Sequence, residues 1–183
     1  DTMSSGAVRY TPQYSFEEYE LWEGDWELWE GVPVSMSPSP VPRHQMVAGN
    51  VYSMLKSAIE ASDCQCVVLY ETDWRIGPNT VVRPDIAVIC RGLPETFIDY
   101  APSVVVEVLS PSTEEKDRTA KKQLYESQGV EVYLIADPAT QTIEAMQLAD
   151  SVYIPIEADD ETLTIDWNGQ CRAAVEVSAV FAE

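Results

Sequence analysis

The fold of this chain is decided by residues 103–137, SVVVEVLSPSTEEKDRTAKKQLYESQGVEVYLIAD. Two apolar runs in this stretch, 103–109 and 130–136, have the length and β-branched content of strands. The segment between them, 113–128, is predicted to be a helix that Gly129 closes. A strand, a helix and a strand of these lengths form a crossover unit, so the two strands are predicted to be parallel neighbours.

Local patterns predict the start of that helix and the other elements. Ser112 and Glu115 form an S-x-x-E sequence, which predicts a capping box. Apolar residues at three- and four-residue steps predict a long helix at 43–60, and Ser15 is expected to cap a short helix at 15–22. Strands are predicted at 26–36 (two strands about a turn), 66–76, 81–90, 142–148, 151–156 and 161–166, with a loop at 37–42 and a short terminal segment at 175–181.

This order of elements predicts an α/β or α+β fold, in which a mixed β-sheet is flanked by the helices 43–60 and 113–128 and followed by a C-terminal antiparallel extension. With 183 residues, of which 45% are hydrophobic, the chain has the size of one domain. Residues 1–13 are expected to be a flexible segment and residues 14–183 a single domain. No apolar run is long enough to span a membrane and the first residues lack the features of a signal peptide, so the expected location is cytoplasmic.

The charge of the chain limits its partners. The formal net charge is −20, from 31 acidic and 11 basic residues. This charge argues against a general nucleic-acid coat protein, because phosphate binding depends on basic side chains. Residues 75–122, however, hold seven acidic and seven basic groups. An anion could therefore be bound in this neutral middle although the chain as a whole repels it.

The cysteines and the histidine limit the metal chemistry. Cys64, Cys66, Cys90 and Cys171 have neither the paired C-x₂-C spacing of a zinc site nor the density of a disulfide scaffold, so reduced core thiols in a cytoplasm are expected. His44 is the single histidine. A metal would have to be held largely by carboxylates, which suits Mg²⁺ or Mn²⁺.

Two carboxylates lie where apolar strands are predicted. Asp85 precedes the apolar run 86–89, and Glu107 lies in the middle of the strand 103–109. A buried carboxylate costs several kcal/mol unless it is protonated, paired or bound to a metal, so the two together suggest a shared cation. Taken singly, each is equally well explained as a strand-end group that faces solvent or an arginine such as Arg83.

The position of a lysine strengthens this interpretation. The strand that holds Glu107 ends near Ser110, about 10 Å further on at ~3.3 Å per residue. Lys121 lies about 13 Å back along the returning helix at ~1.5 Å per residue. If the helix covers the Glu107 face of the sheet, Lys121 reaches the carboxylates, whereas Lys122, rotated by roughly 100°, points elsewhere.

Six linked stretches of the chain carry a resemblance to a known family. They are Trp26–Gly31; Met36–Pro40 with Arg43, His44 and Gln45; Val82–Val88; Val105–Thr113; Asp117 and Arg118 with Lys121 and Tyr125; and Gly129 and Val130 with Tyr133, Asp137 and Pro138. With these stretches the sequence resembles the Uma-type putative restriction endonuclease family, a branch of the PD-(D/E)XK nuclease superfamily. The similarity runs from about residue 14 to 148 in the family's order and spacing. One strand departs from the family pattern, because Val132-Tyr133-Leu134 stands where Glu-Tyr-Trp is usual.

The resemblance implies a restriction-endonuclease-like core, a bacterial cytoplasmic protein, and Mg²⁺-dependent cleavage of DNA in which Mn²⁺ could replace Mg²⁺. Asp85 and Glu107 would be the two acidic metal ligands, with the Val108 carbonyl as a further ligand. The superfamily lysine normally stands two positions after the second acid, where this chain has Leu109. Lys121 on the following helix is its match in this family.

Glu27 and His44 match two further family positions. Glu27 could ligate the metal or hold a metal-bound water, and His44 could hydrogen-bond a carboxylate or a phosphate. Purely structural roles, as a hairpin glutamate and a histidine at a helix start, explain these residues equally well. Cutting both strands of a duplex takes two active sites, and a homodimer would supply them. No sequence feature demonstrates a dimer.

Two other functions stay open. A catalytically inactive nuclease-fold module that binds a protein or has a regulatory role suits the charge of −20, because nucleases normally present a basic groove. A Cys or Ser hydrolase built on His44 is less well supported. The chain has no G-x-S-x-G sequence, and Ser37 and Ser39 lie in the proline-rich loop.

Overall fold

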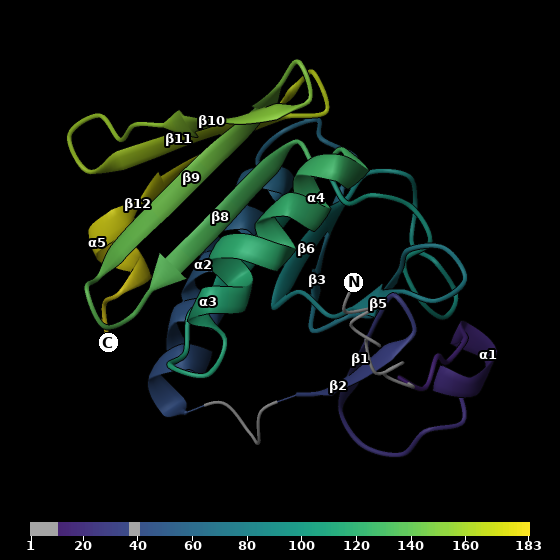
Figure 1. Ribbon diagram of the computed structural model, residues 1–183. Helices are drawn as coiled ribbons and strands as arrows, with labels where there is room; N and C mark the ends of the chain where they lie inside the picture. Colours follow the sequence, from purple (N-terminus) through teal and green to yellow (C-terminus); the bar gives the residue numbers. More distant parts are fainter. Residues whose placement is uncertain (1–10, 37–40) are drawn as a thin grey trace, which may run out of the picture.

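In the computed structural model, which describes residues 11–36 and 41–183, a mixed β-sheet has the strand order β10-β9-β8-β7-β6-β3 (Figure 1). Its strands are β3 (Val67–Tyr70), β6 (Ile86–Ile89), β7 (Val104–Val108), β8 (Val132–Asp137), β9 (Thr142–Ala149) and β10 (Val152–Ile156). β7 and β8 are parallel, and the other neighbouring pairs are antiparallel. The predicted parallel pair on either side of the crossover helix is thus confirmed.

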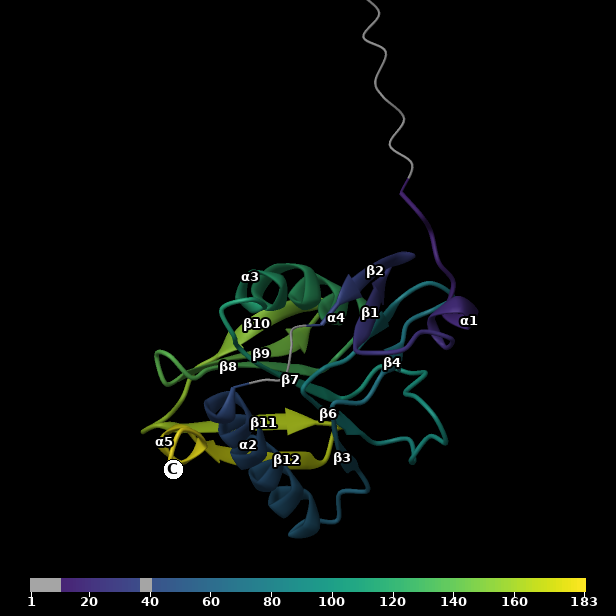
Figure 2. The same cartoon turned by 90° about the horizontal axis from the view of Figure 1, so that it is seen from below.

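The helices cover opposite faces of this sheet, because side chains of a strand alternate between its two faces. On one face Val104, Val106 and Val108 pack with the apolar stripe of α2 (Pro42–Glu60). On the other face Val105 packs with Tyr125 of α4 (Lys122–Gln128). Figure 2 shows α2 below the sheet and α4 above it. Glu107 shares the face of Val105, so it points toward the helix that carries the lysines.

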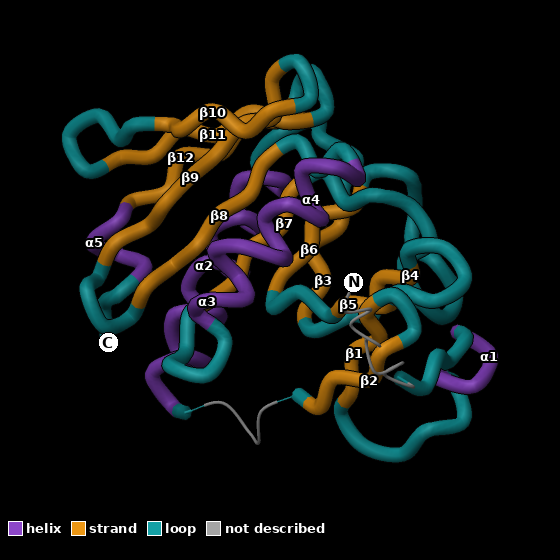
Figure 3. The backbone as a smooth tube through the Cα atoms, in the orientation of Figure 1, coloured by secondary structure: helices purple, strands orange, loops and turns teal. Residues whose placement is uncertain are grey.

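The helix predicted at 113–128 is built in three parts. It begins with α3 (Glu114–Lys116), continues as a π-helical turn, η1 (Asp117–Lys121), and ends in α4, which Gly129 closes with φ 83°. Figure 3 shows the parts following one another across the sheet. The helix start differs from the prediction: the N-cap is Thr113 and no side-chain hydrogen bond caps the helix, so the capping box predicted from Ser112 and Glu115 does not form. Thr113 therefore takes the cap position expected for Ser112.

A second, smaller sheet packs beside the first, with the strand order β2-β1-β5-β4. Its elements are β1 (Trp26–Trp29), β2 (Val32–Ser35), β4 (Trp74–Arg75) and β5 (Val81–Val82). The adjacent helix α1 (Phe16–Tyr19) has the predicted Ser15 cap, which forms a capping box with Glu18. The hairpin predicted at 26–36 is confirmed. Of the loop predicted at 37–42, residues 37–40 lie outside the described residues.

The predicted strands 66–76 and 81–90 each divide between the two sheets. The first is interrupted at Glu71, whose φ of 44° is in the left-handed region. The second is interrupted at Pro84, which has no N–H to donate to a ladder. Asp85 consequently lies at the point where the chain crosses from β5 to β6, beside the end of β7.

The C-terminal extension is antiparallel, as predicted, but its pairing differs. The meander ends with β10, and β11 (Thr162–Trp167) pairs instead with β12 (Cys171–Glu176) in a separate hairpin, followed by α5 (Val177–Val180). Residues 160 and 161, with positive φ, turn the chain before β11. The apolar face of the hairpin then packs against the α2 side of the core, which the sequence periodicity of the single strand β11 could not reveal.

The expectation of reduced cysteines is wrong in this structure. Cys66 forms a disulfide with Cys90, and Cys64 forms one with Cys171. The register of β3 and β6, in which Val67 pairs with Ile89, carries Cys66 opposite Cys90. Their separations along the chain, 24 and 107 residues, give no local signal of this pairing. Among the described residues, no helix has the length and hydropathy needed to cross a membrane.

Candidate active site

The lysine and the strand carboxylate singled out from the sequence meet in the structure. Glu107 on β7 is 2% exposed and Lys121, at the end of η1, is 4% exposed. Lys121 Nζ donates to Glu107 Oε1 at 2.8 Å, and the Tyr125 hydroxyl donates to the same oxygen at 2.6 Å. Lys121 and Tyr125 are four residues apart, so they present one helix face to the sheet. Neither hydrogen bond uses Glu107 Oε2.

Two further carboxylates surround the Lys121 ammonium group. Glu27 Oε1 lies 3.5 Å from Nζ and Asp117 Oδ1 lies 3.4 Å from it. Glu27 comes from β1 in the smaller sheet, where its Oε2 accepts from Lys116 Nζ at 2.7 Å. Both sheets and the helix therefore contribute to one buried charge cluster.

Asp85 lies beside this cluster at the end of β7. Its Oδ2 accepts the Val108 N–H at 2.7 Å, and His44 Nε2 lies 3.3 Å from the same oxygen. Arg83, which the sequence offered as a structural partner of Asp85, instead pairs with Asp25 and Asp73, at 2.7 Å each. The structure thus brings His44, Asp85 and the residue after Glu107 together, on the side from which α2 begins.

Burial and charge shift the acidity of these groups in different directions. Burial raises the pKa of Glu107 to about 8, even though the Lys121 ammonium group acts in the opposite direction. Burial likewise raises the pKa of Asp117. For Glu27 the effect of burial is overcome by Lys121 and Lys116, which lower its pKa to about 2. Glu27 is therefore firmly ionised, whereas burial makes a negative charge on Glu107 or Asp117 energetically unfavourable.

The two basic side chains of the site, Lys121 and His44, have pKa values above those of the exposed groups. Burial alone would lower the pKa of Lys121, but Glu107, Glu27 and Asp117 raise it well above its ordinary value. Burial would also lower the pKa of His44, and its hydrogen bond to Asp85 raises it overall. Lys121 is therefore a permanent positive charge, and His44 binds its proton more strongly than a free imidazole does.

The donor set suits a hard divalent cation. The Lys121 ammonium group is surrounded by four carboxyl groups, those of Glu27, Asp85, Glu107 and Asp117. All of them except Asp85 have an oxygen within 3.5 Å of Lys121 Nζ. Asp117 Oδ1 is buried without a hydrogen-bond partner in the described structure. Within the described residues, three side-chain ligands close enough to share one ion occur only among the cysteines. A cation here would use two carboxylates, a main-chain carbonyl and water, which is the coordination typical of Mg²⁺.

An open hollow adjoins the site at His44. It has a volume of about 760 Å³, and its lining includes Arg43, His44, Ser110, Glu114 and Asp137. Arg118 pairs with Glu114, Asp137 and Glu144 at this side of the molecule. A ligand in the hollow would contact His44, whose Nε2 lies 3.3 Å from Asp85 Oδ2.

Comparison with solved structures defines the class of this fold. A crystal structure of a putative nuclease belonging to DUF820, from Anabaena variabilis at 1.96 Å resolution, matches with a TM-score of 0.73 and 17% sequence identity. The match covers 91% of this chain and 97% of that chain. The fold is therefore the α+β, restriction-endonuclease-like fold that the sequence predicted.

The sequence assigns the chain to a family within that class. Residues 16–169 match the Uma2 family, described as putative restriction endonuclease, and the chain belongs to this family. An uncharacterized protein of Synechocystis sp., slr1290, is 32% identical over 124 residues. The match covers 62% of this chain and 63% of that relative, so somewhat less than two thirds of the relative is matched. The family resemblance is thus confirmed.

Sequence reasoning missed part of the cluster. Lys116 and the carboxylate of Asp117 received no role, although Asp117 belongs to one of the family-like stretches. The π-helical turn runs from Asp117 to Lys121. Its two end residues contact each other, with Asp117 Oδ1 3.4 Å from Lys121 Nζ. Regular helical periodicity carries no signal of such a turn, which is often found at functional sites.

Proposed function

We propose that the protein is an endonuclease that hydrolyses phosphodiester bonds in DNA with Mg²⁺, or Mn²⁺ in its place, held by Asp85, Glu107 and the Val108 carbonyl. The observation that carries this proposal is the 2.8 Å contact of Lys121 with Glu107, next to the strand end where Asp85 accepts the Val108 N–H. Two acids and a lysine at one strand end are the groups that metal-assisted phosphate hydrolysis needs. Membership of a family of putative restriction endonucleases supports the same reaction.

Each side chain has a separate task in this proposal. When bound, Mg²⁺ would polarise the scissile phosphate and lower the pKa of a bound water. Lys121 supplies a fixed positive charge and can donate a hydrogen bond to a phosphate oxygen or to the attacking water. Glu27 and Asp117 hold the ammonium group in position and keep it charged. Tyr125 orients Glu107 through Oε1, which leaves Oε2 for the cation.

His44 is proposed to position Asp85 and to contact the phosphate backbone at the entrance of the site. Its Nε2 faces the Asp85 carboxylate, and the residue also lines the hollow beside the site. Arg43 and Ser110 in the same lining offer further hydrogen-bond donors to phosphate oxygens. Arg43 and His44 thus offer basic groups at the entrance of a site in a chain whose net charge is −20.

The test is a cleavage assay with supercoiled plasmid and with single- and double-stranded oligonucleotides of DNA and RNA, in Mg²⁺ and in Mn²⁺. Glu107→Gln and Lys121→Met are each expected to lower the rate by about 100-fold or more, as loss of a group that stabilises developing charge does. The matched control is Lys122→Met, which changes the next residue and keeps activity. Equal cleavage by the native chain and all three variants would refute the proposal.

The acidity of the chain favours a second candidate, a catalytically inactive module that keeps the nuclease fold for protein binding or regulation. The net charge of −20 and the near-complete burial of Glu107 and Lys121 are the observations in its favour. Binding of Mn²⁺ or Ca²⁺ to the native chain and to Asp85→Ala separates the two. A functional site binds the ion and loses it in the variant, whereas an inactive module binds no ion at this position.

A further inference from the structure

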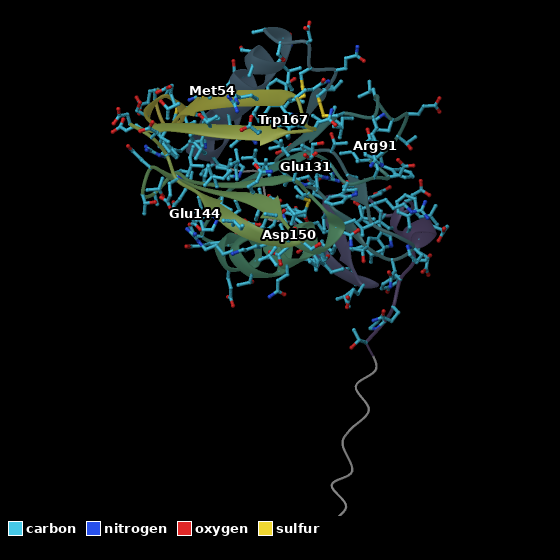
Figure 4. The ribbon with its side chains drawn as sticks, turned by 90° about the horizontal axis from the view of Figure 1, so that it is seen from above. Met54, Arg91, Glu131, Glu144, Asp150 and Trp167 are labelled. Atoms are coloured by element: carbon cyan, nitrogen blue, oxygen red, sulfur yellow. A yellow bond between two sulfur atoms is a disulfide. The ribbon has the colours of Figure 1, made fainter. Side chains whose placement is uncertain are left out.

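We propose that the four cysteines, in their reduced state, form a tetrathiolate site for one Zn²⁺ ion. These cysteines come from three places in the chain: Cys64 and Cys66 lie between α2 and β3, Cys90 follows β6 and Cys171 begins β12. They are all the cysteines of the chain. The fold nevertheless gathers them into one cluster beside the hairpin that carries Trp167, where Figure 4 shows sulfur atoms in yellow.

The spacing of the sulfur atoms is the first argument. Besides the two disulfides, Cys64 Sγ lies 3.4 Å from Cys66 Sγ, and Cys66 Sγ lies 3.7 Å from Cys171 Sγ. Two independent disulfides have no need to touch each other. A zinc ion bound by four thiolates at ~2.3 Å in a tetrahedron holds its sulfur atoms roughly 3.8 Å apart. The contacts between the disulfides are therefore close to the edges of such a tetrahedron.

Three of the four ligand atoms already lie within reach of one ion. The Sγ atoms of Cys64, Cys66 and Cys171 are all within 4.8 Å of one another. Cys90 is held opposite Cys66 by the pairing of β3 with β6, so the fourth sulfur lies next to Cys66 Sγ, to which it is bonded. Opening both disulfides would let the sulfur atoms surround a central ion with small side-chain movements.

The surroundings suit a closed structural site rather than a catalytic one. Cys64, Cys66 and Cys171 are buried, and Cys90 is partly exposed, which gives an ion a route inward. The four ligands would fill every position of a tetrahedral ion and leave none for a substrate. The ion would join the end of α2, the edge of the main sheet and the C-terminal hairpin, which are the parts that the disulfides join.

This site is separate from the carboxylate cluster. His44 lies near the start of α2 and Cys64 lies beyond its end, so the two positions are about 25 Å or more apart at ~1.5 Å per helical residue. The ligand preferences also differ, because thiolates bind Zn²⁺ whereas carboxylates and water suit Mg²⁺. The zinc site therefore does not depend on the proposed nuclease activity.

The two states are related by a balanced reaction. Each disulfide takes two electrons and two protons from a dithiol reductant, which itself becomes a disulfide. The four thiols so formed release four protons when they bind Zn²⁺ as thiolates. The structure described here is the oxidised state of the cluster.

The test begins with the full chain, reduced with a phosphine, desalted without oxygen and titrated with Co²⁺ as a spectroscopic probe for zinc. One Co²⁺ per chain is expected, with the absorption of a tetrahedral thiolate complex, and Zn²⁺ should displace it. Cys171→Ser is expected to weaken the absorption strongly, and Glu107→Gln, which changes only the carboxylate cluster, to leave it intact. A reduced chain without the tetrahedral spectrum, or a spectrum that Cys171→Ser leaves unchanged, would overturn the proposal.

A second measurement uses only the native chain and so does not depend on how a variant folds. The rate of thiol alkylation is measured on the reduced protein with and without one equivalent of Zn²⁺. Because the metal holds the reactive thiolates, zinc is expected to slow the modification of all four cysteines by about tenfold or more. Equal alkylation rates with and without zinc would overturn the proposal.

Discussion

Replacing Lys121 with methionine should destabilise the protein severely, because it removes the charge that three buried carboxylates share. The Nζ atom lies 2.8 Å from Glu107, 3.4 Å from Asp117 and 3.5 Å from Glu27. Removing one partner of a buried ion pair costs about 3–5 kcal/mol, since the remaining charge stays buried and unpaired. For a domain of this size, 1 kcal/mol corresponds to a Tm change of about 2–4 °C, so a loss of roughly 6–20 °C is expected.

The assay is urea unfolding followed by circular dichroism, with Lys122→Met as the matched control. Lys122 is partly exposed, and its substitution should change the free energy of unfolding by about 0.5 kcal/mol or less. The double variant Lys121→Met/Glu107→Gln should recover part of the lost stability, because one unpaired carboxylate is removed together with the lysine. A Lys121→Met protein within about 1 kcal/mol of the native chain, or a double variant no more stable than the single one, would contradict the reasoning.

Two further predictions concern the partners of this cluster. Glu27 has a folded-state pKa of about 2 against an ordinary value of 4.5. Its ionised side chain therefore adds about 3 kcal/mol to the free energy of unfolding above pH 4.5, and this contribution is lost as the pH falls through 2. Glu27→Gln should therefore be less stable than the native chain at pH 7 in urea unfolding, and the gap should narrow toward pH 2; a constant gap would contradict this origin. Tyr125→Phe removes the 2.6 Å hydrogen bond to Glu107 Oε1 and should lower the free energy of unfolding by about 1.5–3 kcal/mol in the same assay. No measurable change would mean that this bond does not hold Glu107.

Much of the fold was predictable because its signals are local. The parallel pair β7 and β8 followed from two apolar runs around a helix closed by Gly129. The contact of Lys121 with Glu107 followed from the rise per residue of a strand and of a helix, once the helix covers that face of the sheet. Such inferences need only the regular geometry of one crossover unit.

The remainder depended on contacts between distant segments. Cys64 and Cys171 are separated by 107 residues, and no spacing rule joins them. The pairing of β11 with β12 likewise required knowing that this hairpin packs against α2. The convergence of Glu27 on Lys121 depends on how the smaller sheet sits beside the larger one, which single-strand periodicity does not encode.

The central claim, that Asp85 and Glu107 bind a divalent cation at the end of β7, is tested most directly by a crystal structure obtained with Mn²⁺. The anomalous scattering of manganese identifies the ion independently of the protein atoms. The account predicts a peak on the order of 2 Å from carboxylate oxygens of Asp85 and Glu107 and from the Val108 carbonyl, and no such peak in Asp85→Asn crystals. A peak only elsewhere on the surface, or none at all in the native protein, would contradict it.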